Sequence, residues 1–192
     1  MPRASQAEKA KPARLDADAW IAAAFDALAE GGIDAVRVEP LAKALDITKG
    51  SFYWHFADRR ALLDAMLASW AYGRITAIQE QATVRGAPEK VLGDLADLYT
   101  RHANLRGLTI ELAIRSLART DEAAAKAVRS VDRERLRHVG ELFVALGWPA
   151  SQAQARAILF YSYLFGQSLL DSKVVPVAAR DKAIRALIAP PS

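Results

Sequence analysis

Apolar residues recur at intervals of three or four along most of this 192-residue chain, which is the spacing of one face of an α-helix. Two short runs, AVRV at 35–38 and VVPV at 174–177, alternate or cluster as strands do, but both are too short and too isolated to pair. Glycine and proline interrupt the apolar pattern at intervals of helix length, at Gly31-Gly32, Gly86 to Pro88, Gly107, Gly147 to Pro149 and Pro176. We therefore predict an all-α fold.

These interruptions also predict where each helix begins and ends. The first helix carries Ile21, Phe25 and Leu28 at helical spacing, and we expect these three side chains to form its buried stripe. The expected helices span 16–30, 39–45, 48–56, a long segment from about 58, then 88–103, 108–118, 121–146, 151–171 and 177–188, with Asp58, Asp121 and Ser151 as N-caps.

The stretch ITKGSFYWHF at 47–56 is unusually rich in aromatic residues. On a helix, Phe52 and Phe56 share one face and can pack on the preceding helices, whereas Gly50 and Trp54 point away from that face. A core helix explains the two phenylalanines, but it leaves Trp54 in water and includes a glycine that weakens the helix by up to ~1 kcal/mol. Two short helices joined by a tight turn, the second with such an outward face, are typical of a helix-turn-helix that enters the DNA major groove.

The segment VRVEPLAKALDITKGSFYWHFADRRALL at 36–63 resembles the DNA-binding segment of the TetR/AcrR family of transcriptional regulators. The resemblance implies a flexible basic arm at 1–14, a three-helix DNA-binding head at 15–57, and a larger helical body at 58–192 that binds an effector and dimerises. Asp46 stands where the family usually has glycine in the turn. Since Asp tolerates the left-handed backbone conformation better than most residues, we expect the turn to be kept.

The resemblance also implies roles for individual residues of the head. Lys49, Gly50, Ser51 and Trp54 correspond to positions that lie in the groove, where Lys49 can reach a phosphate or a guanine edge and Trp54 a thymine methyl group. The remaining positions imply contacts with the DNA backbone, and these are Arg37, Thr48, Tyr53, His55 and Arg59.

Composition and charge narrow the function without deciding it. The net charge is +4, but residues 1–60 contain nine Lys/Arg and nine Asp/Glu, so global charge does not by itself indicate a nucleic-acid partner. The chain has no cysteine, which excludes disulfides and thiolate chemistry, and neither a signal segment nor a membrane-spanning run is recognisable. We expect a cytoplasmic protein with no metal, no cofactor and no catalytic activity. A helical protein-interaction module and a small helical enzyme that does not bind DNA remain the alternatives.

The run ILFYSYLFGQSLL at 158–170 is apolar nearly all round. A core helix of one chain would explain this, but a helix packed on both its own domain and a second subunit explains it better. Proteins of the resembling family dimerise through their last two helices. We therefore predict a homodimer that binds a palindromic operator in double-stranded DNA, with an interface that includes Ser162, Gly166, Leu169, Leu170, Ile184 and Leu187.

The body is rich enough in aromatic residues to predict a pocket for an apolar or aromatic small-molecule effector. The alternatives are that these rings only fill the core, that His102 is a structural residue, and that Glu111 and Arg115 form an ordinary helical salt bridge. The charge-dense stretch VDRERLRHVGELF at 131–143 predicts mainly a solvated helix face. The predicted pocket residues are Trp70, Tyr99, His102, Arg115, Phe143, Phe160 and Tyr163.

Overall fold

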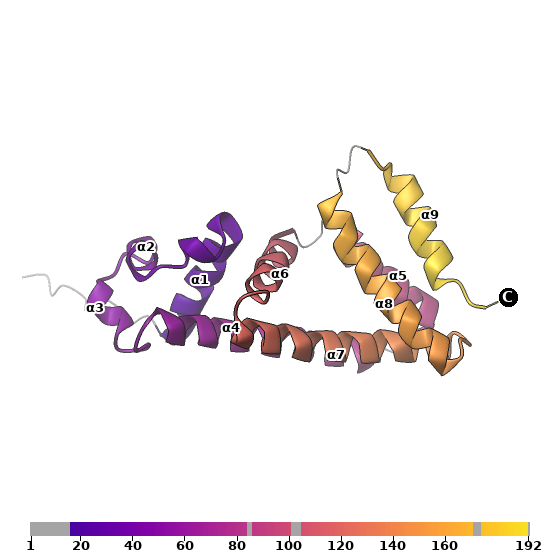
Figure 1. Cartoon of the computed structure of the whole chain (residues 1–192), viewed down its shortest axis with the longest axis horizontal. Helices are drawn as coiled ribbons and strands as arrows, with labels where there is room; N and C mark the ends of the chain where they lie inside the picture. The colour runs from indigo at the N-terminus through magenta and orange to yellow at the C-terminus, as the bar shows by residue number, and fades with distance from the viewer. Residues whose placement is uncertain (1–15, 84–85, 101–104, 171–173, 192) are drawn as a thin grey trace, which may run out of the picture.

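The computed structural model describes residues 16–83, 86–100, 105–170 and 174–191. Within these ranges the chain forms nine α-helices, two short 3₁₀ helices and no strand, which confirms the predicted fold class. Figure 1 shows the three N-terminal helices gathered at one end and two long helices, α4 and α7, that run side by side along the molecule. No helix in the described ranges combines the length and the apolar character that crossing a bilayer requires.

The head consists of α1 and the two short helices that follow it. Asp16 caps α1, accepting a hydrogen bond of 3.0 Å from the amide of Ala19. The observed elements are α1 (Ala17–Gly31), the 3₁₀ turn η1 (Ile33–Ala35), α2 (Val38–Ala44) and α3 (Lys49–Phe52). The helices predicted at 16–30 and 39–45 are therefore confirmed to within one residue at each end.

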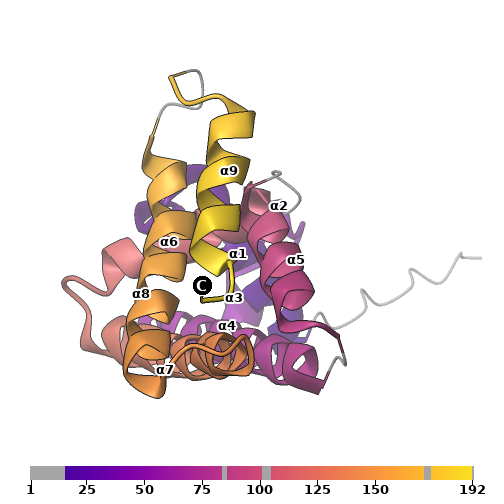
Figure 2. The same ribbon diagram turned by 90° about the vertical axis from the view of Figure 1, so that its right-hand side faces the viewer.

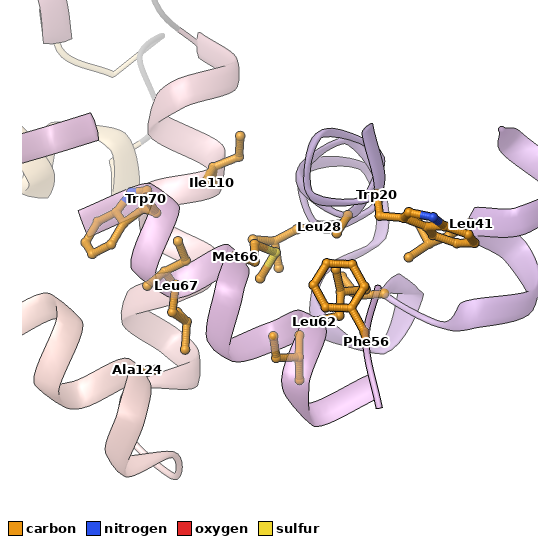
Figure 3. Packing of buried hydrophobic residues seen from close by; sticks show 14 of the residues in the cluster. Trp20, Leu28, Leu41, Phe56, Leu62, Met66, Leu67, Trp70, Ile110 and Ala124 are labelled. Carbon is orange, nitrogen blue, oxygen red and sulfur yellow. The ribbon is translucent and has the colours of Figure 1, made fainter. Parts of the chain in front are cut away.

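The buried stripe of α1 includes Leu28, as predicted, but its other members lie one residue before the predicted Ile21 and Phe25. Trp20, Ala24 and Leu28 are buried, whereas Ile21 and Phe25 are only partly so. Figure 3 shows Trp20 and Leu28 pointing into the core that α1 shares with α4. Both stripes have helical spacing, so periodicity alone does not decide which of the two faces inward.

The body contains the remaining six helices. Asp58 caps α4 through the amide of Ala61 at 2.8 Å, and Asp121 caps α7 through the amide of Ala124 at 2.9 Å, as predicted. The helices are α4 (Arg59–Thr83), α5 (Pro88–Thr100), α6 (Leu105–Leu117), α7 (Glu122–Ala145), α8 (Ala150–Gly166) with the 3₁₀ turn η2 (Gln167–Leu169), and α9 (Val177–Ile188).

Three predicted boundaries in the body are wrong. Gly107 lies in the first turn of α6 instead of before the helix, where its lack of a side chain costs little. Ser151 lies inside α8, because Pro149 takes the N-cap position with its fixed extended backbone. The α-helix predicted to reach 171 ends at Gly166 and tightens into η2.

One apolar core joins the head to the body across the predicted domain boundary at 57–58. It includes Trp20 and Phe52 of the head, Met66 of α4, and Ile110 and Ala124 of the body. A second core lies between α5, α7, α8 and α9, and Figure 2 shows α5 and α8 standing on either side above the α4–α7 pair. Since α4 begins next to the head, contacts α1 and packs along α7, it is the element through which the two parts are mechanically connected.

Candidate nucleic-acid interface and body cavity

The turn between α2 and α3 is built around Asp46, which stands where the TetR/AcrR family, which this segment resembles, usually has glycine. Asp46 has φ of 54°, the left-handed conformation that the sequence predicted it to tolerate. The turn is closed by a hydrogen bond of 3.0 Å from the amide of Ile47 to the carbonyl of Ala42. The two short helices are thus held in a helix-turn-helix arrangement.

Phe52 anchors α3 to the rest of the head. Its ring is fully buried, and its centroid lies 5.1 Å from that of Trp20 in an edge-to-face contact and 5.4 Å from that of Phe56. The α-helix stops at Phe52 instead of continuing to 56, because the amides of Trp54 and His55 bond to carbonyls three residues back in tighter turns. Phe56 is nonetheless buried on the same side as Phe52, as predicted.

The opposite side of α3 presents aromatic side chains to solvent. Trp54 is 79% exposed and Tyr53 is 57% exposed, and Lys49, Gly50 and His55 are exposed beside them. A Cβ atom at Gly50 would meet only the hydroxyl oxygen of Thr48, at an ordinary 3.8 Å. Packing within the chain therefore does not require glycine at position 50, whereas close approach of another molecule would explain it.

Lys49 and Ser51, two of the polar residues of this surface, already have partners within the head. Nζ of Lys49 lies 2.5 Å from Oε1 of Glu39 on α2, and this pairing raises the pKa of Lys49 and lowers that of Glu39. The hydroxyl of Ser51 donates to the carbonyl of Thr48 at 2.8 Å. Thr48 occupies the N-cap position of α3, but its side chain makes no capping hydrogen bond. Arg37, at the N-cap of α2, is exposed at the edge of the same surface.

Arg59 has a structural role that sequence reasoning missed. Its Nε donates to the carbonyl of Val36 at 2.6 Å, and a terminal nitrogen donates to the carbonyl of Ile33 at 2.7 Å. These bonds tie the first turn of α4 to the segment that connects α1 to α2. Sequence spacing could not reveal them, since their acceptors are backbone atoms more than twenty residues away.

The predicted effector residues do not gather in one place. Trp70 is buried in the first core, and Phe143 and Phe160 pack against each other in the second, with their centroids 6.4 Å apart. The hydroxyl of Tyr163 donates to the carbonyl of Arg180 at 2.8 Å, beside a separate small hollow between α8 and α9. His102 lies outside the described residues.

A cavity of about 80 Å³ does lie in the body, and among the described residues Tyr99 is the one predicted pocket residue that lines it. Its walls come from α4, α5, α6, α7 and α8. The apolar part of the wall includes Ile78, Leu95 and Leu108. Its polar lining consists of Arg74, Gln81, Tyr99, Glu111, Arg135 and Tyr161.

Glu111 is the centre of a buried ionic cluster beside this cavity. It is 2% exposed, and its two carboxylate oxygens accept hydrogen bonds of 2.7 and 2.8 Å from Arg135. Arg115 adds a bond of 2.8 Å from Nε, which confirms the predicted pairing along α6. Burial alone would raise the pKa of the Glu111 carboxyl, but the hydrogen bonds from Arg135 and the charges of the nearby arginines hold it below its usual value.

Arg135 lies in the stretch that was predicted to be solvated, and that prediction is wrong for this residue. Arg135 is 2% exposed. It lies four residues from Val131 and four from Val139, which are both fully buried on the same face of α7. The sequence does contain a signal for this buried ion pair, because Arg135 has the helical spacing of the apolar residues Val131 and Val139.

The helices predicted to dimerise leave part of their apolar surface open. On α8, Ile158, Leu159 and Ser162 are exposed, and a Cβ atom at Gly166 would have no neighbour within 4 Å. Leu169 and Leu170 are exposed at the end of η2, and Leu187 is half-buried. Ile184 is instead buried in the second core of its own chain.

Residues 21–66 match a family model described as bacterial regulatory proteins, tetR family. A segment of the chain is similar to the tetracycline repressor protein class D of Escherichia coli, with 44% identity over 54 residues, which are 28% of this chain and 25% of the relative. It is also similar to the class G protein of Vibrio anguillarum, with 42% identity over 53 residues, covering 28% and 25% of the two chains. The matched region therefore spans about a quarter of the length of these curated relatives.

The fold of the whole chain is also similar to solved structures. A transcriptional regulator from Rhodococcus sp. Rha1 aligns with a TM-score of 0.73 at 20% identity, over 91% of this chain and 94% of that one. Salmonella enterica GusR aligns with a TM-score of 0.70 at 16% identity, over 94% and 97% of the two chains. At these identities the likeness concerns the fold.

Proposed function

We propose that this chain, whose N-terminal segment belongs to the tetR family of bacterial regulatory proteins, is a DNA-binding transcriptional repressor that a small-molecule effector releases from its operator. The observation that carries the proposal is the outward face of α3. Trp54 and Tyr53 are exposed there beside Gly50, a residue that the chain's own packing does not require. Large exposed aromatic side chains on an otherwise well-packed head mark a contact surface.

In this proposal α3 lies in the major groove. Gly50 lets the backbone approach the DNA closely, Trp54 contacts base edges, and Lys49 exchanges Glu39 for a phosphate or a guanine. Thr48, Tyr53, His55 and Arg37 surround this centre and contact the DNA backbone. Ser51 reaches the groove by giving up its bond to the carbonyl of Thr48.

Arg59 acts differently from the other basic residues of the head in this proposal. Its guanidinium fixes the start of α4 to the α1–α2 connection, so it positions α3 for binding. The side chain is exposed enough for an additional phosphate contact.

The body, from residue 58, is the effector-binding and dimerisation part. Two copies pair through α8 and α9, where Ile158, Leu159 and Ser162 form an exposed apolar and small-residue surface. Each head then binds one half-site of a palindrome, with half-site centres about 34–36 Å apart or a multiple of this distance. The effector occupies the cavity between α4 and α8 and shifts the equilibrium between head spacings through α4.

Selection of bound sequences from a random double-stranded DNA pool by the full chain tests this function. We expect enrichment of one two-fold symmetric sequence, and its retardation in a gel should fall steeply as salt rises from 50 to 200 mM, as phosphate contacts require. If no sequence is enriched, the chain is not a sequence-specific regulator, and a protein-interaction module or an enzyme becomes the better description.

A further inference from the structure

The body cavity is small for an effector site. Its volume of about 80 Å³ is well under the ~150 Å³ of an engineered cavity that holds benzene. In this conformation the cavity has room for one polar group of a ligand and a short apolar extension. A larger ligand would have to extend past Leu98, a partly exposed residue of the cavity wall. The chemistry of the lining is therefore more informative than the size of the cavity.

The ionic cluster beside the cavity contains more cations than anions. Arg74, Arg115 and Arg135 are within ion-pair distance of two described carboxylates, Glu111 and Asp132. Arg135 uses both of its terminal nitrogens on Glu111. Arg115 forms two hydrogen bonds to Asp132, one of 2.9 Å and one shorter. These two bidentate pairs balance both carboxylates.

Arg74 is the cation of the cluster that belongs to neither bidentate pair. Its Nε lies 3.8 Å from Oε2 of Glu111, beyond hydrogen-bond distance, and the described residues offer it no closer carboxylate. Its terminal nitrogen donates a bond of 3.3 Å to the carbonyl of Gly107, which is long. Arg74 lines the cavity from α4, so a planar guanidinium with unused donor capacity borders this space. Such a group favours an anion with two oxygens in one plane.

The other lining groups fit the rest of such a molecule. The hydroxyl of Tyr99 accepts a long hydrogen bond of 3.5 Å from Arg135, and the amide of Gln81 adds a further polar group. Ile78 and Leu108 supply apolar wall on the α4 and α6 sides. We infer that the cavity binds a small organic carboxylate, with its carboxylate group on Arg74 and its short aliphatic part against the apolar wall. This inference rests on the proposed function only in naming that carboxylate as the effector.

Calorimetric titration of the full chain with propionate and butyrate, each matched with its uncharged amide, tests the inference without DNA. We expect both carboxylates to bind at least about tenfold more tightly than propionamide and butyramide, since a hydrogen-bonded charge pair contributes about 1.5–3 kcal/mol, and 1.4 kcal/mol is tenfold. Arg74→Gln should remove this preference. Arg129→Gln, in an exposed ion pair with Glu122 on α7, is the matched control and should leave it unchanged.

Arg74→Lys, which keeps the charge but loses the planar fork, should show an intermediate preference and serves if Arg74→Gln does not fold. Carboxylates that bind no better than their amides, fail to bind at all, or bind Arg74→Gln as they bind the parent chain would overturn the inference. The selection of operator sequences from the DNA pool tests the proposed function separately from the carboxylate titration. Operator binding without carboxylate binding refutes this inference alone, and carboxylate binding without any enriched DNA sequence refutes the proposed function alone.

Discussion

Replacing Phe52 and Trp54 by alanine, one at a time, separates the stability of the head from its binding. The two rings are two residues apart and point in opposite directions. Phe52 is fully buried, with the centroids of Trp20, Tyr53 and Phe56 between 5.1 and 5.4 Å from its own. Trp54 is 79% exposed, and its removal leaves no cavity.

The expected magnitudes follow from these two environments. Phe52→Ala removes a ring that its neighbours cannot easily replace, so it should lower the free energy of unfolding by about 3–5 kcal/mol. Domains are typically stable by only ~5–15 kcal/mol, and Phe52 belongs to the core shared with α4, so this loss should be visible in the whole chain. Trp54→Ala should change the free energy of unfolding by less than about 0.5 kcal/mol. It should weaken operator binding by roughly 1–3 kcal/mol if the indole contacts base edges.

Denaturant unfolding and gel retardation with the selected operator measure the two effects. Tyr72→Ala is a suitable control, because Tyr72 is 75% exposed on α4, away from the head surface; it should alter neither stability nor DNA binding. Substantial destabilisation by Trp54→Ala would show that the faces of α3 are assigned wrongly. Full operator affinity in Trp54→Ala would show that this aromatic surface does not contact DNA.

Three further predictions concern the ionic cluster, the start of α4 and the dimer. Glu111→Gln should destabilise the chain by about 3–5 kcal/mol at neutral pH by leaving buried arginine charge unpaired. Because the pKa of folded Glu111 lies below its ordinary 4.5, its contribution is present above that value and is lost as the pH falls through the folded pKa. Unfolding measurements should therefore find that Glu111→Gln lowers the free energy of unfolding by less in acid than at neutral pH. A loss that does not change with pH would contradict the assignment of Glu111 as the ionised partner of the arginines. Arg59→Met should weaken operator binding without changing the slope of log affinity against log salt if Arg59 only positions α3, whereas a slope smaller by about 1 would indicate a phosphate contact. Leu159→Asp should give monomers in sedimentation at micromolar concentration while Val144→Asp, an exposed apolar site on α7, stays dimeric; a monomeric parent chain would refute the dimer itself.

Local patterns predicted most of the helices, because their signals lie within a few residues of each other. The helix at 177–188 begins and ends where proline and periodicity placed it, and the left-handed turn at Asp46 needed only the properties of that residue. The stripe of α1 was misplaced since Trp20 and Ala24 have the same spacing as Ile21 and Phe25. Contact with Phe52, more than thirty residues later, decides between the two faces.

The two candidate sites also differ in whether local sequence or contact between distant residues determines them. The outward face of α3 could be predicted from helix geometry alone, because Gly50 and Trp54 belong to one short segment. The body cavity depends on which helices adjoin, and no residue spacing reveals that Arg74 of α4 lies near Glu111 of α6. Aromatic residues were a poor guide there, since Phe143 and Phe160 fill the second core while the polar groups line the cavity.

Lys49 carries its own counter-charge into any encounter with DNA, because Glu39 lies 2.5 Å from its ammonium group. A regulator of the proposed kind must search among roughly 10⁶–10⁹ competing genomic sites, and most of that contact is with phosphates of unrelated sequence. On such DNA the exchange of a carboxylate for a phosphate brings Lys49 little, while Glu39 is left facing the negative backbone. A site whose base edges offer Lys49 additional hydrogen bonds makes the exchange more favourable. The ion pair therefore shortens each visit to the wrong sequence, and it makes the speed of the search, as well as the final affinity, a property of α2 and α3 together.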